Sequence, residues 1–466
     1  MAEFEPLYTA DEMRVAEARY PGYPGSAPEL MERAGAQAAR VAQAEFGDAV
    51  RWAFVCGGGS NGGDGRIMAR HLENAGKDVR VVDAKAGETD LGEPDVIVDA
   101  LFGTGFSGTP RDDAAALIER INASPAAVFA IDLPSGVDAS TGEAAGAAVR
   151  ADATVTFHGR KVGLLVAPGR FHTGRLHVAD IGLEDVQTAM RLATVELLRS
   201  VPRRHERDNK YTAGHVLVVG GSRGFTGAPS LSALAAMRAD AGYVTVAAPA
   251  SSLPVLEQRL LEAVKRPLAD DDDGIVAASA TETVLELARK ASSLAIGPGL
   301  GRGPGPKELV RRVLAEIELP VVADADALFE LEPAEWAGPR VLTPHEGELA
   351  RLLGRESAEV AAHRLASVRE AVERFGCVVL LKGPDTLVAA PGAGVIVASL
   401  GLPSLATAGT GDVLTGIVAA FLAKGLEPQR AAAAAAVAQQ RASVEAPQRA
   451  GLVASDLIDA LPRVLR

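Results

Sequence analysis

Two glycine-rich segments hold residues suited to chemistry, one in each half of the 466-residue chain. The first runs from Gly57 to Gly65 and contains six glycines in nine residues. The second runs from Thr407 to Gly416 and includes Asp412. Glycines let a backbone approach a ligand closely, and a helix that starts beside them presents unpaired N–H groups to an anion. Both segments therefore predict sites for phosphate-bearing ligands.

The first segment matches the G-x-G-x-x-G spacing of dinucleotide-binding loops at Gly57, Gly59 and Gly62. Asp83 follows at the distance of a ribose-binding acid, so this pattern alone favours a Rossmann dehydrogenase. Asp64 argues against that interpretation, because a carboxylate in the loop would repel a pyrophosphate bound to the same amides. A bound cation or a hydroxyl-rich ligand would tolerate the carboxylate.

Polar residues also follow other predicted strands in the first half. Two loops run from Asp99 to Gly105 and from Asp132 to Asp138, and Lys161 lies just after a further strand. The carboxyl ends of parallel strands converge on one crevice, so these loops are expected to meet at one ligand. The residues expected to face it are Asn61, Asp99, Asp132 and Ser135.

The second segment is expected to precede a helix over residues 417–424. Asp412 would then take a proton from a hydroxyl while the loop stabilises a transferring phosphoryl group. Considered by itself, Asp412 is equally compatible with an ordinary first-turn carboxylate that interacts with the helix dipole. Two other predicted strand ends, Gly297–Gly301 and Lys382–Thr386, offer amides, a hydroxyl and an ammonium group, and this context favours a ligand site.

Short β-branched runs alternate with helical patterns, which predicts two doubly wound α/β domains with parallel sheets. Helices are expected over Pro28–Phe46 and Arg66–Ala75. In the first half the predicted strands are Trp52–Cys56, Val79–Val82, Val96–Val98, Val128–Ile131 and Val155–Phe157. In the second half they are His215–Val219, Val244–Ala247, Ser293–Ile296, Val321–Ala323, Arg340–Leu342 and Val378–Leu381.

The alternation is interrupted by a polar segment, Arg203–Lys210, where we place the boundary between the two domains. The chain is too long for one ordinary core, so a second domain is expected. The sequence therefore predicts a first domain over residues 1–199 and a second over residues 200–466.

The composition indicates a cytoplasmic protein that acts on small molecules. A net charge of −13 gives no electrostatic footprint for nucleic acid or an anionic membrane, so neither partner is expected. The two cysteines, Cys56 and Cys377, each lie in an apolar run and are expected to be buried free thiols. The N-terminus carries no secretory signal pattern. We expect a homo-oligomer in the cytoplasm.

The first half resembles the NAD(P)H-hydrate epimerases in the order and content of its motifs. The motifs that carry this resemblance are residues 29–35, Asn61–Gly65, Asp99–Gly105, Asp132–Gly136 and Thr156–Lys161. The resemblance implies a Rossmann-like three-layer sandwich with a potassium ion held by Asn61, Asp99 and Ser135. It points to Asp132 and Lys161 as proton-transfer groups. The residues implied to contact a hydrated nicotinamide nucleotide are Ser60, Asn61, Gly62, Gly63, Asp64, Gly103, Thr104, Gly105, Phe106, Ser107, Gly108, Thr109 and Asp132.

The second half resembles the ADP-dependent NAD(P)H-hydrate dehydratases of the ribokinase-like fold. The motifs are Lys210–Gly214, Gly220–Ser222, Gly227–Pro229, Gly297–Gly301, Thr343–Glu348, Lys382–Thr386 and Ala408–Gly416. The resemblance implies that Ala228, Gly299, His345 and Asp412 contact the hydrated nucleotide. It implies contact with ADP, bound with Mg²⁺, for Lys382, Gly383, Pro384, Asp385, Thr386 and Gly411.

Together the two resemblances imply repair of NADH or NADPH that has been hydrated at C6 of the nicotinamide ring. The first domain would interconvert the R and S epimers, and the second would dehydrate the S epimer with ADP, giving AMP and phosphate. Asp412 would be the base of that second reaction. One alternative is a ribokinase-like small-molecule kinase that releases a stable phosphorylated product. Another is that the first half is a nucleotide-binding module without turnover.

Overall fold

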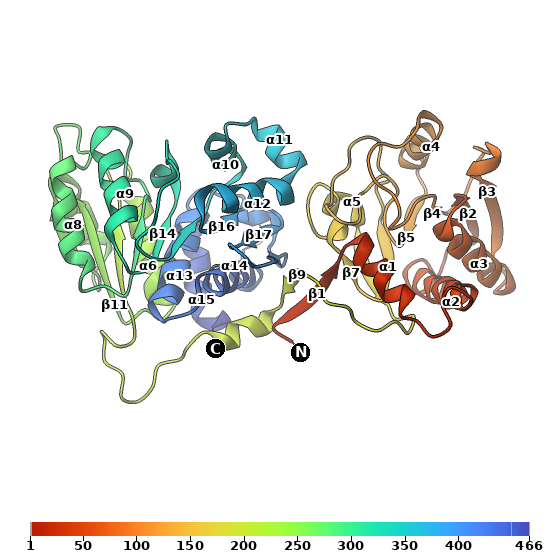
Figure 1. The fold of residues 1–466 in the computed structure, drawn as a ribbon, viewed down its shortest axis with the longest axis horizontal. Coiled ribbons are helices and arrows are strands. Elements are labelled where there is room, and N and C mark those ends of the chain that lie inside the picture. Colours follow the sequence, from red (N-terminus) through yellow and green to blue (C-terminus); the bar gives the residue numbers. More distant parts are fainter. Residues whose placement is uncertain (1, 449, 466) are drawn as a thin grey trace. The chain divides into compact units, whose positions relative to one another are not determined.

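The computed structural model describes residues 2–448 and 450–465, and these divide into two compact units (Figure 1). The N-terminal unit comprises Pro6–Met190 with Ala361–Arg364, and the C-terminal unit comprises the rest of the described chain. The change from one unit to the other thus falls between residues 190 and 191. The polar segment used to place the boundary near residue 200 lies inside the C-terminal unit.

The N-terminal unit is built on a fully parallel sheet in the order β3-β2-β4-β5-β6-β8. Successive side chains of a strand face opposite sides of the sheet. Phe54 therefore packs in the cluster with α2 and α3, whereas Val55 packs in the cluster with α4. The strands are β2 (Arg51–Cys56), β3 (Asp78–Asp83), β4 (Val96–Ala100), β5 (Ala127–Ile131), β6 (Ala153–Phe157) and β8 (Arg175–Ala179).

Helices cover both faces of this sheet, which makes the unit the three-layer sandwich that the sequence predicts. In Figure 1, α4 lies on one side of the strands and α2 and α3 on the other. A short strand β1 (Phe4–Tyr8) pairs in parallel with β7 (Arg160–Lys161), which places Tyr8 opposite Lys161. The helices are α1 (Ala10–Ala18), α2 (Ala27–Glu45), α3 (Ser60–Asn74), α4 (Asp112–Ala123) and α5 (Arg170–Thr173).

The first glycine-rich segment is mostly helix, so the prediction of a loop up to Gly65 and a helix from Arg66 is wrong. Helix α3 begins at Ser60, and Ser60–Asp64 form its first turns. A Cβ on Gly62 would lie 2.0 Å from the carbonyl oxygen of Gly57, and one on Gly65 would lie 2.5 Å from Ala100 Cβ. The glycines therefore let the helix pack closely against the strand ends.

The C-terminal unit contains strands in the order β12-β11-β10-β13-β14-β15-β16-β17-β18. The first seven are parallel, and the pairs β16–β17 and β17–β18 are antiparallel. Five of these strands have the bounds that the sequence predicts: β10 (His215–Val219), β13 (Ser293–Ile296), β14 (Val321–Ala323), β15 (Arg340–Leu342) and β16 (Val378–Leu381). The others are β11 (Tyr243–Pro249), β12 (Val264–Leu268), β17 (Thr386–Ala389) and β18 (Val395–Ala398), while β9 (Met190–Ala193) precedes them in the chain.

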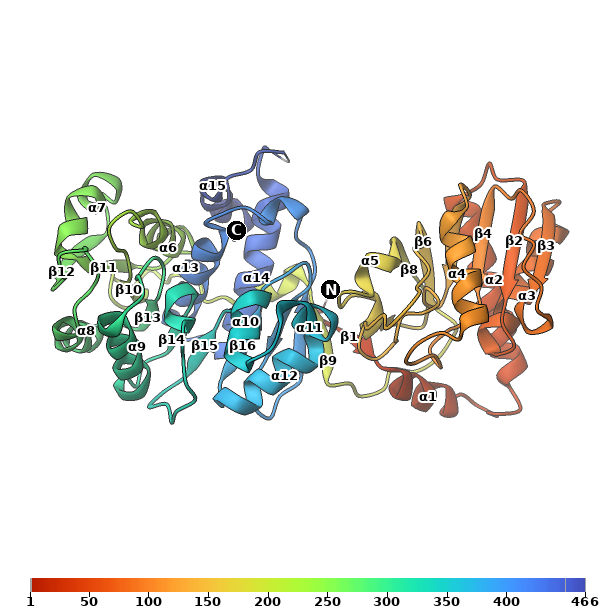
Figure 2. The ribbon, with the colours of Figure 1, turned by 90° about the horizontal axis from the view of Figure 1, so that it is seen from above.

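Helices again lie on both sides of the strands, as Figure 2 shows for α8, α9 and α12 on one side and α6, α14 and α15 on the other. Helix α13 is buried along most of its length, from Val413 to Leu422. This is the second predicted three-layer sandwich. The helices are α6 (Gly227–Arg238), α7 (Leu253–Arg259), α8 (Thr281–Ala288), α9 (Pro304–Glu316), α10 (Glu346–Leu353), α11 (Ser357–Ala362), α12 (Arg364–Phe375), α13 (Thr410–Ala423), α14 (Pro428–Glu445) and α15 (Ala454–Val464).

The second glycine-rich segment is also mainly helix, because α13 begins at Thr410 rather than at residue 417. The expectation that Asp412 precedes the helix is therefore wrong, since Asp412 lies in its first turn. A Cβ on Gly416 would lie 2.2 Å from the carbonyl oxygen of Ser232 in α6. Close packing of α13 against α6 thus stabilises a helix start that its glycines alone would disfavour.

Over residues 2–448 and 450–465, no helix combines the length and the apolar character that crossing a bilayer requires. The alanine-rich run Ala431–Ala438 belongs to α14 and is buried in the core of the C-terminal unit.

Candidate active sites

A cavity of about 740 Å³ lies where the carboxyl ends of β2, β4 and β5 meet in the N-terminal unit. Residues of the first turn of α3 and of the segment after β4 line one part of it. Helices α1 and α2 contribute other lining residues, among them Glu17 and Met31. The cavity thus forms at the crevice where parallel strands converge.

A buried ion pair lies at this cavity. Lys161 Nζ is 2.9 Å from Asp132 Oδ1, and the side chains of Lys161 and Asp132 are 1% and 11% exposed. Lys161 Nζ also donates to Thr156 Oγ1 at 2.9 Å and to the carbonyl oxygen of Phe157 at 2.8 Å. The backbone N–H of Thr104 donates to Asp132 Oδ2 at 3.0 Å. Both charged groups are therefore held in one orientation.

Two further carboxyl groups line the same cavity. Burial raises the pKa of Asp64 to about 8, and the charges of Asp132 and Glu17 act in the same direction. Burial likewise raises the pKa of Glu17, with the charge of Asp132 as the next cause. At neutral pH Asp64 is therefore mostly protonated, which resolves the difficulty of a charged carboxylate in this segment.

Hydrogen bonds through the carbonyl oxygen of Phe102 and through Ser135 link Asn61 to the fully buried Asp99. Asp99 Oδ1 accepts from Ser135 Oγ at 2.6 Å, and Asp99 Oδ2 accepts from the N–H of Ser135 at 2.7 Å. Asn61 Nδ2 donates to the carbonyl oxygen of Phe102 at 2.8 Å. Among the described residues Asn61 Oδ1 is buried and has no hydrogen-bond donor. Oxygen-only donors of this kind suit a hard cation.

The structure brings most of the predicted epimerase residues to one place. The cavity is lined by Ser60, Asn61, Asp64, Gly103, Thr104, Gly105, Phe106, Ser107, Asp132 and Lys161. Gly62, Gly63, Gly108 and Thr109 are not among its lining residues. Asp83, the acid of the dehydrogenase pattern, is paired with Arg66 at 2.9 Å.

In the C-terminal unit the loops after several strands are tied together by hydrogen bonds. Ser222 Oγ, after β10, donates to the carbonyl oxygen of Gly299, after β13, at 2.9 Å. The N–H of Gly301 donates to Asp326 Oδ2, after β14, at 3.0 Å. The N–H of Lys382, after β16, donates to the carbonyl oxygen of Pro344 at 2.9 Å. The predicted convergence of strand ends is thus present here as well.

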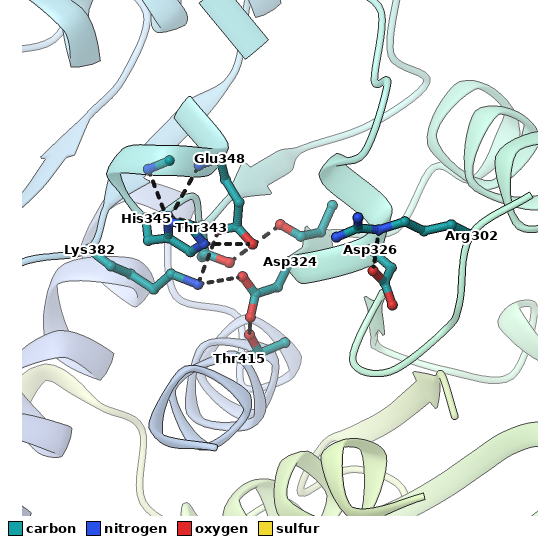
Figure 3. Close-up of polar contacts among 10 residues, drawn as sticks. Arg302, Asp324, Asp326, Thr343, His345, Glu348, Lys382 and Thr415 are labelled. Atoms are coloured by element: carbon teal, nitrogen blue, oxygen red, sulfur yellow. Dashed lines mark hydrogen bonds and ion pairs between the residues drawn. The ribbon is translucent and has the colours of Figure 1, made fainter. Parts of the chain in front are cut away.

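At the centre of these loops, Asp324 joins Lys382 to helix α13 (Figure 3). Lys382 Nζ donates to Asp324 Oδ1 at 2.7 Å, and Thr415 Oγ1 donates to Asp324 Oδ2 at 2.7 Å. Glu348 Oε2 lies 3.7 Å from Lys382 Nζ. A Cβ on Gly411 would lie 3.4 Å from the same ammonium group. A cation therefore lies against the first turn of α13, where backbone N–H groups attract anions.

Asp412, in this first turn, has the properties of a base that works near neutral pH. Burial raises the pKa of Asp412 to about 7, with the charge of Asp324 as the next largest cause. Asp326 and Glu348 also raise it, whereas Lys382 lowers it. For Lys382 itself, burial lowers the pKa, but the charges of Asp324 and Glu348 outweigh burial and the net shift is upward. Lys382 therefore keeps its positive charge.

His345, predicted to contact the hydrated nucleotide, caps helix α10. Its Nδ1 accepts from the N–H groups of Gly347 and Glu348 at 3.0 and 3.4 Å. Glu348 Oε2 in turn accepts from the N–H of His345 at 2.8 Å, which completes a capping box. The His345 side chain is 56% exposed, and its Nε2 lies 3.5 Å from Glu348 Oε1.

The other predicted dehydratase residues differ in exposure. Ala228 lies at the start of α6, and a Cβ on Gly299 would be 3.3 Å from Ala228 Cβ. Gly383 and Pro384 are exposed in the turn after β16, whereas Asp385 and Thr386 are buried. The tip of this turn is therefore accessible, while the Asp385 side chain points into the protein.

Sequence reasoning missed Asp324, Thr415 and Glu17. Asp324 directly follows the apolar strand β14, in the same way that Asp99 and Asp132 mark strand ends in the first half. That signal was available in the sequence. Thr415 and Glu17 lie within helices, and only the packing of α13 and α1 shows where their side chains lie.

The chain has two α/β units whose sheets are wholly or mainly parallel, and in each unit charged groups are fixed at strand ends. These features define a two-domain enzyme that handles nucleotide ligands. A family model described as NAD(P)H-hydrate dehydratase matches residues 216–463, and one described as YjeF-related protein N-terminus matches residues 27–90 and 82–163. The chain belongs to the family of bifunctional NAD(P)H-hydrate repair enzymes. The resemblance inferred from the sequence motifs is thereby confirmed.

Relatives over nearly the full length support this membership. The bifunctional NAD(P)H-hydrate repair enzyme Nnr of Moorella thermoacetica is 40% identical, with 94% of this chain and 92% of that one aligned. The Escherichia coli enzyme of the same name is 34% identical over 94% of this chain and 89% of its own. Among solved structures, the ADP/ATP-dependent NAD(P)H-hydrate dehydratase from Bacillus subtilis, co-crystallised with ATP/Mg2+, is 29% identical. It superposes with a TM-score of 0.51 and covers 58% of this chain and 96% of its own.

Proposed function

We propose that the C-terminal unit dehydrates the S epimer of hydrated NADH or NADPH with ADP, and that the N-terminal unit interconverts the R and S epimers. These units approximate the domains expected over residues 200–466 and 1–199, although residues 191–199 belong to the C-terminal unit. The observation that carries the proposal is the position of Asp412 in the first turn of α13, with the Lys382 ammonium against the same turn.

In the dehydratase reaction, Asp412 accepts the proton of the C6 hydroxyl group. The hydroxyl oxygen attacks the β-phosphorus of ADP, and the bond to the AMP oxygen breaks. Lys382 and the N–H groups of the first turn, including that of Gly411, stabilise the charge on the transferred phosphoryl group. The phosphate then leaves from C6 as C5 loses a proton, which restores the ring double bond of NADH or NADPH.

ADP enters this site as its Mg²⁺ complex, and the exposed tip of the turn at Gly383 and Pro384 supports its placement after β16. Ala228, Gly299 and His345 are the residues proposed to contact the hydrated nicotinamide nucleotide. The preference for ADP follows the family resemblance, and the B. subtilis relative is named for both ADP and ATP.

In the epimerase reaction, Asp132 is the proposed acceptor of the C6 hydroxyl proton as the bond between C6 and the ring nitrogen N1 breaks, which leaves an aldehyde at C6. The same bond re-forms on the other face of that aldehyde and gives the other epimer. Lys161, at 2.9 Å from Asp132, donates a proton to N1 as the ring opens, and it takes that proton back as the ring closes, when Asp132 returns its proton to the hydroxyl oxygen. Asp64 is mostly protonated at neutral pH and donates a hydrogen bond to the substrate. The lining residues from Gly103 to Ser107 are proposed to contact the sugar and phosphate groups.

The oxygen cluster of Asn61, Asp99 and Ser135 fits the proposed potassium ion, because its donors are all oxygen and Asn61 Oδ1 has no other partner among the described residues. A bound ion would supply positive charge beside the nucleotide phosphates. We expect K⁺ to raise the unfolding temperature more than an equal concentration of a bulky organic cation does. Asn61→Leu removes the free oxygen and should abolish that difference.

The test of the proposal measures recovery of the near-ultraviolet absorbance of dihydronicotinamide from a mixture of both hydrate epimers, with ADP and Mg²⁺. The unaltered chain should restore both epimers and release AMP and phosphate. Asp412→Ala should restore neither epimer, with turnover reduced by about 10²-fold or more because the base is absent.

The alternative activities give different results in the same assay. A small-molecule kinase would consume ADP or ATP with another acceptor and would leave a stable phosphorylated product without any gain in absorbance. If the N-terminal unit only bound nucleotide, the S epimer would be consumed and the R epimer would remain except for its slow spontaneous conversion. Either result would replace the corresponding part of the proposal.

We also place the chain in the cytoplasm, which the two buried free cysteines, Cys56 and Cys377, support. Assembly as a homo-oligomer stays a prediction, which static light scattering of the purified chain would test.

A further inference from the structure

Asp324 is held rigidly at the carboxyl end of β14. Its backbone N–H donates to the carbonyl oxygen of Ile296 at 3.1 Å, and its own carbonyl oxygen accepts from the N–H of Ala327 at 3.1 Å. The residue is only 1% exposed. With the backbone bonded on both sides, the direction of the side chain is determined by the fold.

The two carboxylate oxygens of Asp324 accept hydrogen bonds from two different elements. Oδ1 accepts from Lys382 Nζ, after β16, and Oδ2 accepts from Thr415 Oγ1 in α13, each at 2.7 Å. Figure 3 shows this carboxylate between the ammonium group and the helix. Asp324 therefore determines how far the Lys382 ammonium lies from the first turn of α13.

We propose that Asp324 is a positioning residue of the dehydratase site, whose carboxylate holds the Lys382 ammonium where the phosphoryl group of ADP is transferred. This inference rests on the proposed function of the C-terminal unit. Asp324 contacts neither substrate in this role, because both of its oxygens are already engaged within the protein.

The charge of Asp324 has a second effect on the same site. Four charged groups influence Asp412: Asp324, Asp326 and Glu348 raise its pKa, and Lys382 lowers it. Of the three carboxylates Asp324 has the largest influence. Its carboxylate thus also helps Asp412 to act as a base near neutral pH.

The first test is Asp324→Asn, which keeps the size of the side chain and removes its charge. We expect the KM for ADP to rise about tenfold, because an amide no longer holds the ammonium group in place. We also expect the acid limb of the pH profile of kcat/KM to move to lower pH, since a negative charge near Asp412 is lost. A role in folding alone would lower the unfolding temperature and leave both quantities unchanged.

Asp326→Asn is the matched control. Asp326 also raises the pKa of Asp412, but it accepts from the N–H of Gly301 and from Arg302 Nε, each at 3.0 Å, and not from Lys382. Its substitution should move the acid limb in the same direction by a smaller amount and leave the KM for ADP unchanged. If both variants raise the KM equally, loss of charge alone explains the result and the positioning role is overturned.

A second pair of variants keeps the test decisive if Asp324→Asn does not fold. Lys382→Met should raise the KM for ADP, and adding Asp324→Asn to it should raise the KM no further, because Asp324 acts through Lys382. The double variant removes both charges of the Asp324–Lys382 pair, so neither member of that pair is left without its partner. If the two substitutions raise the KM for ADP by factors that multiply in the double variant, they act independently and the inference is contradicted.

Failure of the inference is distinct from failure of the proposed function. A chain that restores no dihydronicotinamide from the S epimer with ADP contradicts the proposed function. The unaltered chain can be active while Asp324→Asn leaves the KM for ADP and the acid limb of the kcat/KM profile unchanged. That result contradicts only the role of Asp324.

Discussion

The buried pair Asp132–Lys161 illustrates how single residues are prepared for chemistry in this protein. Lys161 donates to Asp132, Thr156 and the carbonyl oxygen of Phe157, so its ammonium group is fully engaged while it is almost completely buried. Removing a partner from such a pair leaves an uncompensated charge. Substitution of either side chain should therefore disturb the pair, and the disturbance should be confined to the N-terminal cavity.

Lys161→Met should stop conversion of the R epimer while the S epimer is still dehydrated, because the two reactions use different units. We expect epimerisation to slow by about 10²- to 10⁴-fold, the usual contribution of a proton-transfer group. The measurement follows absorbance recovery separately from purified R and S epimers. Lys77→Met is the control, since Lys77 lies outside the cavity lining and should leave both rates unchanged. Equal loss for both epimers would argue against the assignment.

The proposed role of Asp412 as the base predicts how dehydration depends on pH. Its pKa is raised to about 7, and only the deprotonated carboxylate accepts a proton. We therefore expect kcat/KM for the S epimer to fall as pH drops below about 7, tenfold per pH unit, and to level off above it. Initial rates at constant ionic strength across this range measure the profile. A profile that stays flat through neutral pH would mean that Asp412 is not the base.

At the scale of elements, both proposed sites depend on helices that contain glycines in their first two turns, where Gly62 of α3 and Gly416 of α13 fit closely against neighbouring backbone. Helix α3 starts at Ser60 and α13 at Thr410, each earlier than the sequence predicts. Glycine is unfavourable inside an isolated helix. Packing of α3 against strand ends and of α13 against α6 supplies the stabilisation. In each unit the position of the helix start therefore depends on the packing of the core.

Gly62→Ala tests this coupling in α3. The added Cβ would lie 2.0 Å from the carbonyl oxygen of Gly57, so the helix start must shift, and we expect a loss of about 1–3 kcal/mol in the free energy of unfolding. Gly59→Ala is the matched control, because a Cβ there has nothing within 4 Å. Chemical denaturation of both variants measures the difference. Equal stability of the two variants would show that the close contact is not required.

At the scale of the whole molecule, the residues of each proposed site belong to one unit. The cavity with Asp132 and Lys161 is lined from the N-terminal unit, and Asp324, Lys382 and Asp412 belong to the C-terminal unit. Neither proposed reaction therefore needs a group from the other unit. The two activities should be separable by single substitutions in the full-length chain.

A mixture of two single variants tests this separation. Asp132→Asn should retain only dehydration, and Asp412→Ala should retain only epimerisation, so each alone should leave the R epimer unrepaired. Mixed together, they should convert the R epimer to NADH or NADPH, because the S epimer diffuses from one chain to the other. If the mixture remains inactive although each variant retains its own single reaction, the substrate must pass within one chain.

Much of the architecture was predictable from the sequence, because buried parallel strands are short apolar runs that follow one another at regular intervals. Strand β10 at His215–Val219 and strand β16 at Val378–Leu381 have the predicted bounds for this reason. Acids that directly follow such runs were also recognisable, as Asp99 and Asp132 show. Asp324 carries the same signal and was overlooked.

The sequence by itself determined the two α/β units, the strand ends where polar residues gather and the family to which the chain belongs. These features depend on local periodicity and on the order of motifs along the chain. The tertiary structure alone decided the starts of α3 and α13, the contacts of Asp324 with Lys382 and Thr415, and the raised pKa values of Asp64 and Asp412. The reason is that close packing, burial and nearby charge arise between residues far apart in the chain, and no local pattern specifies them.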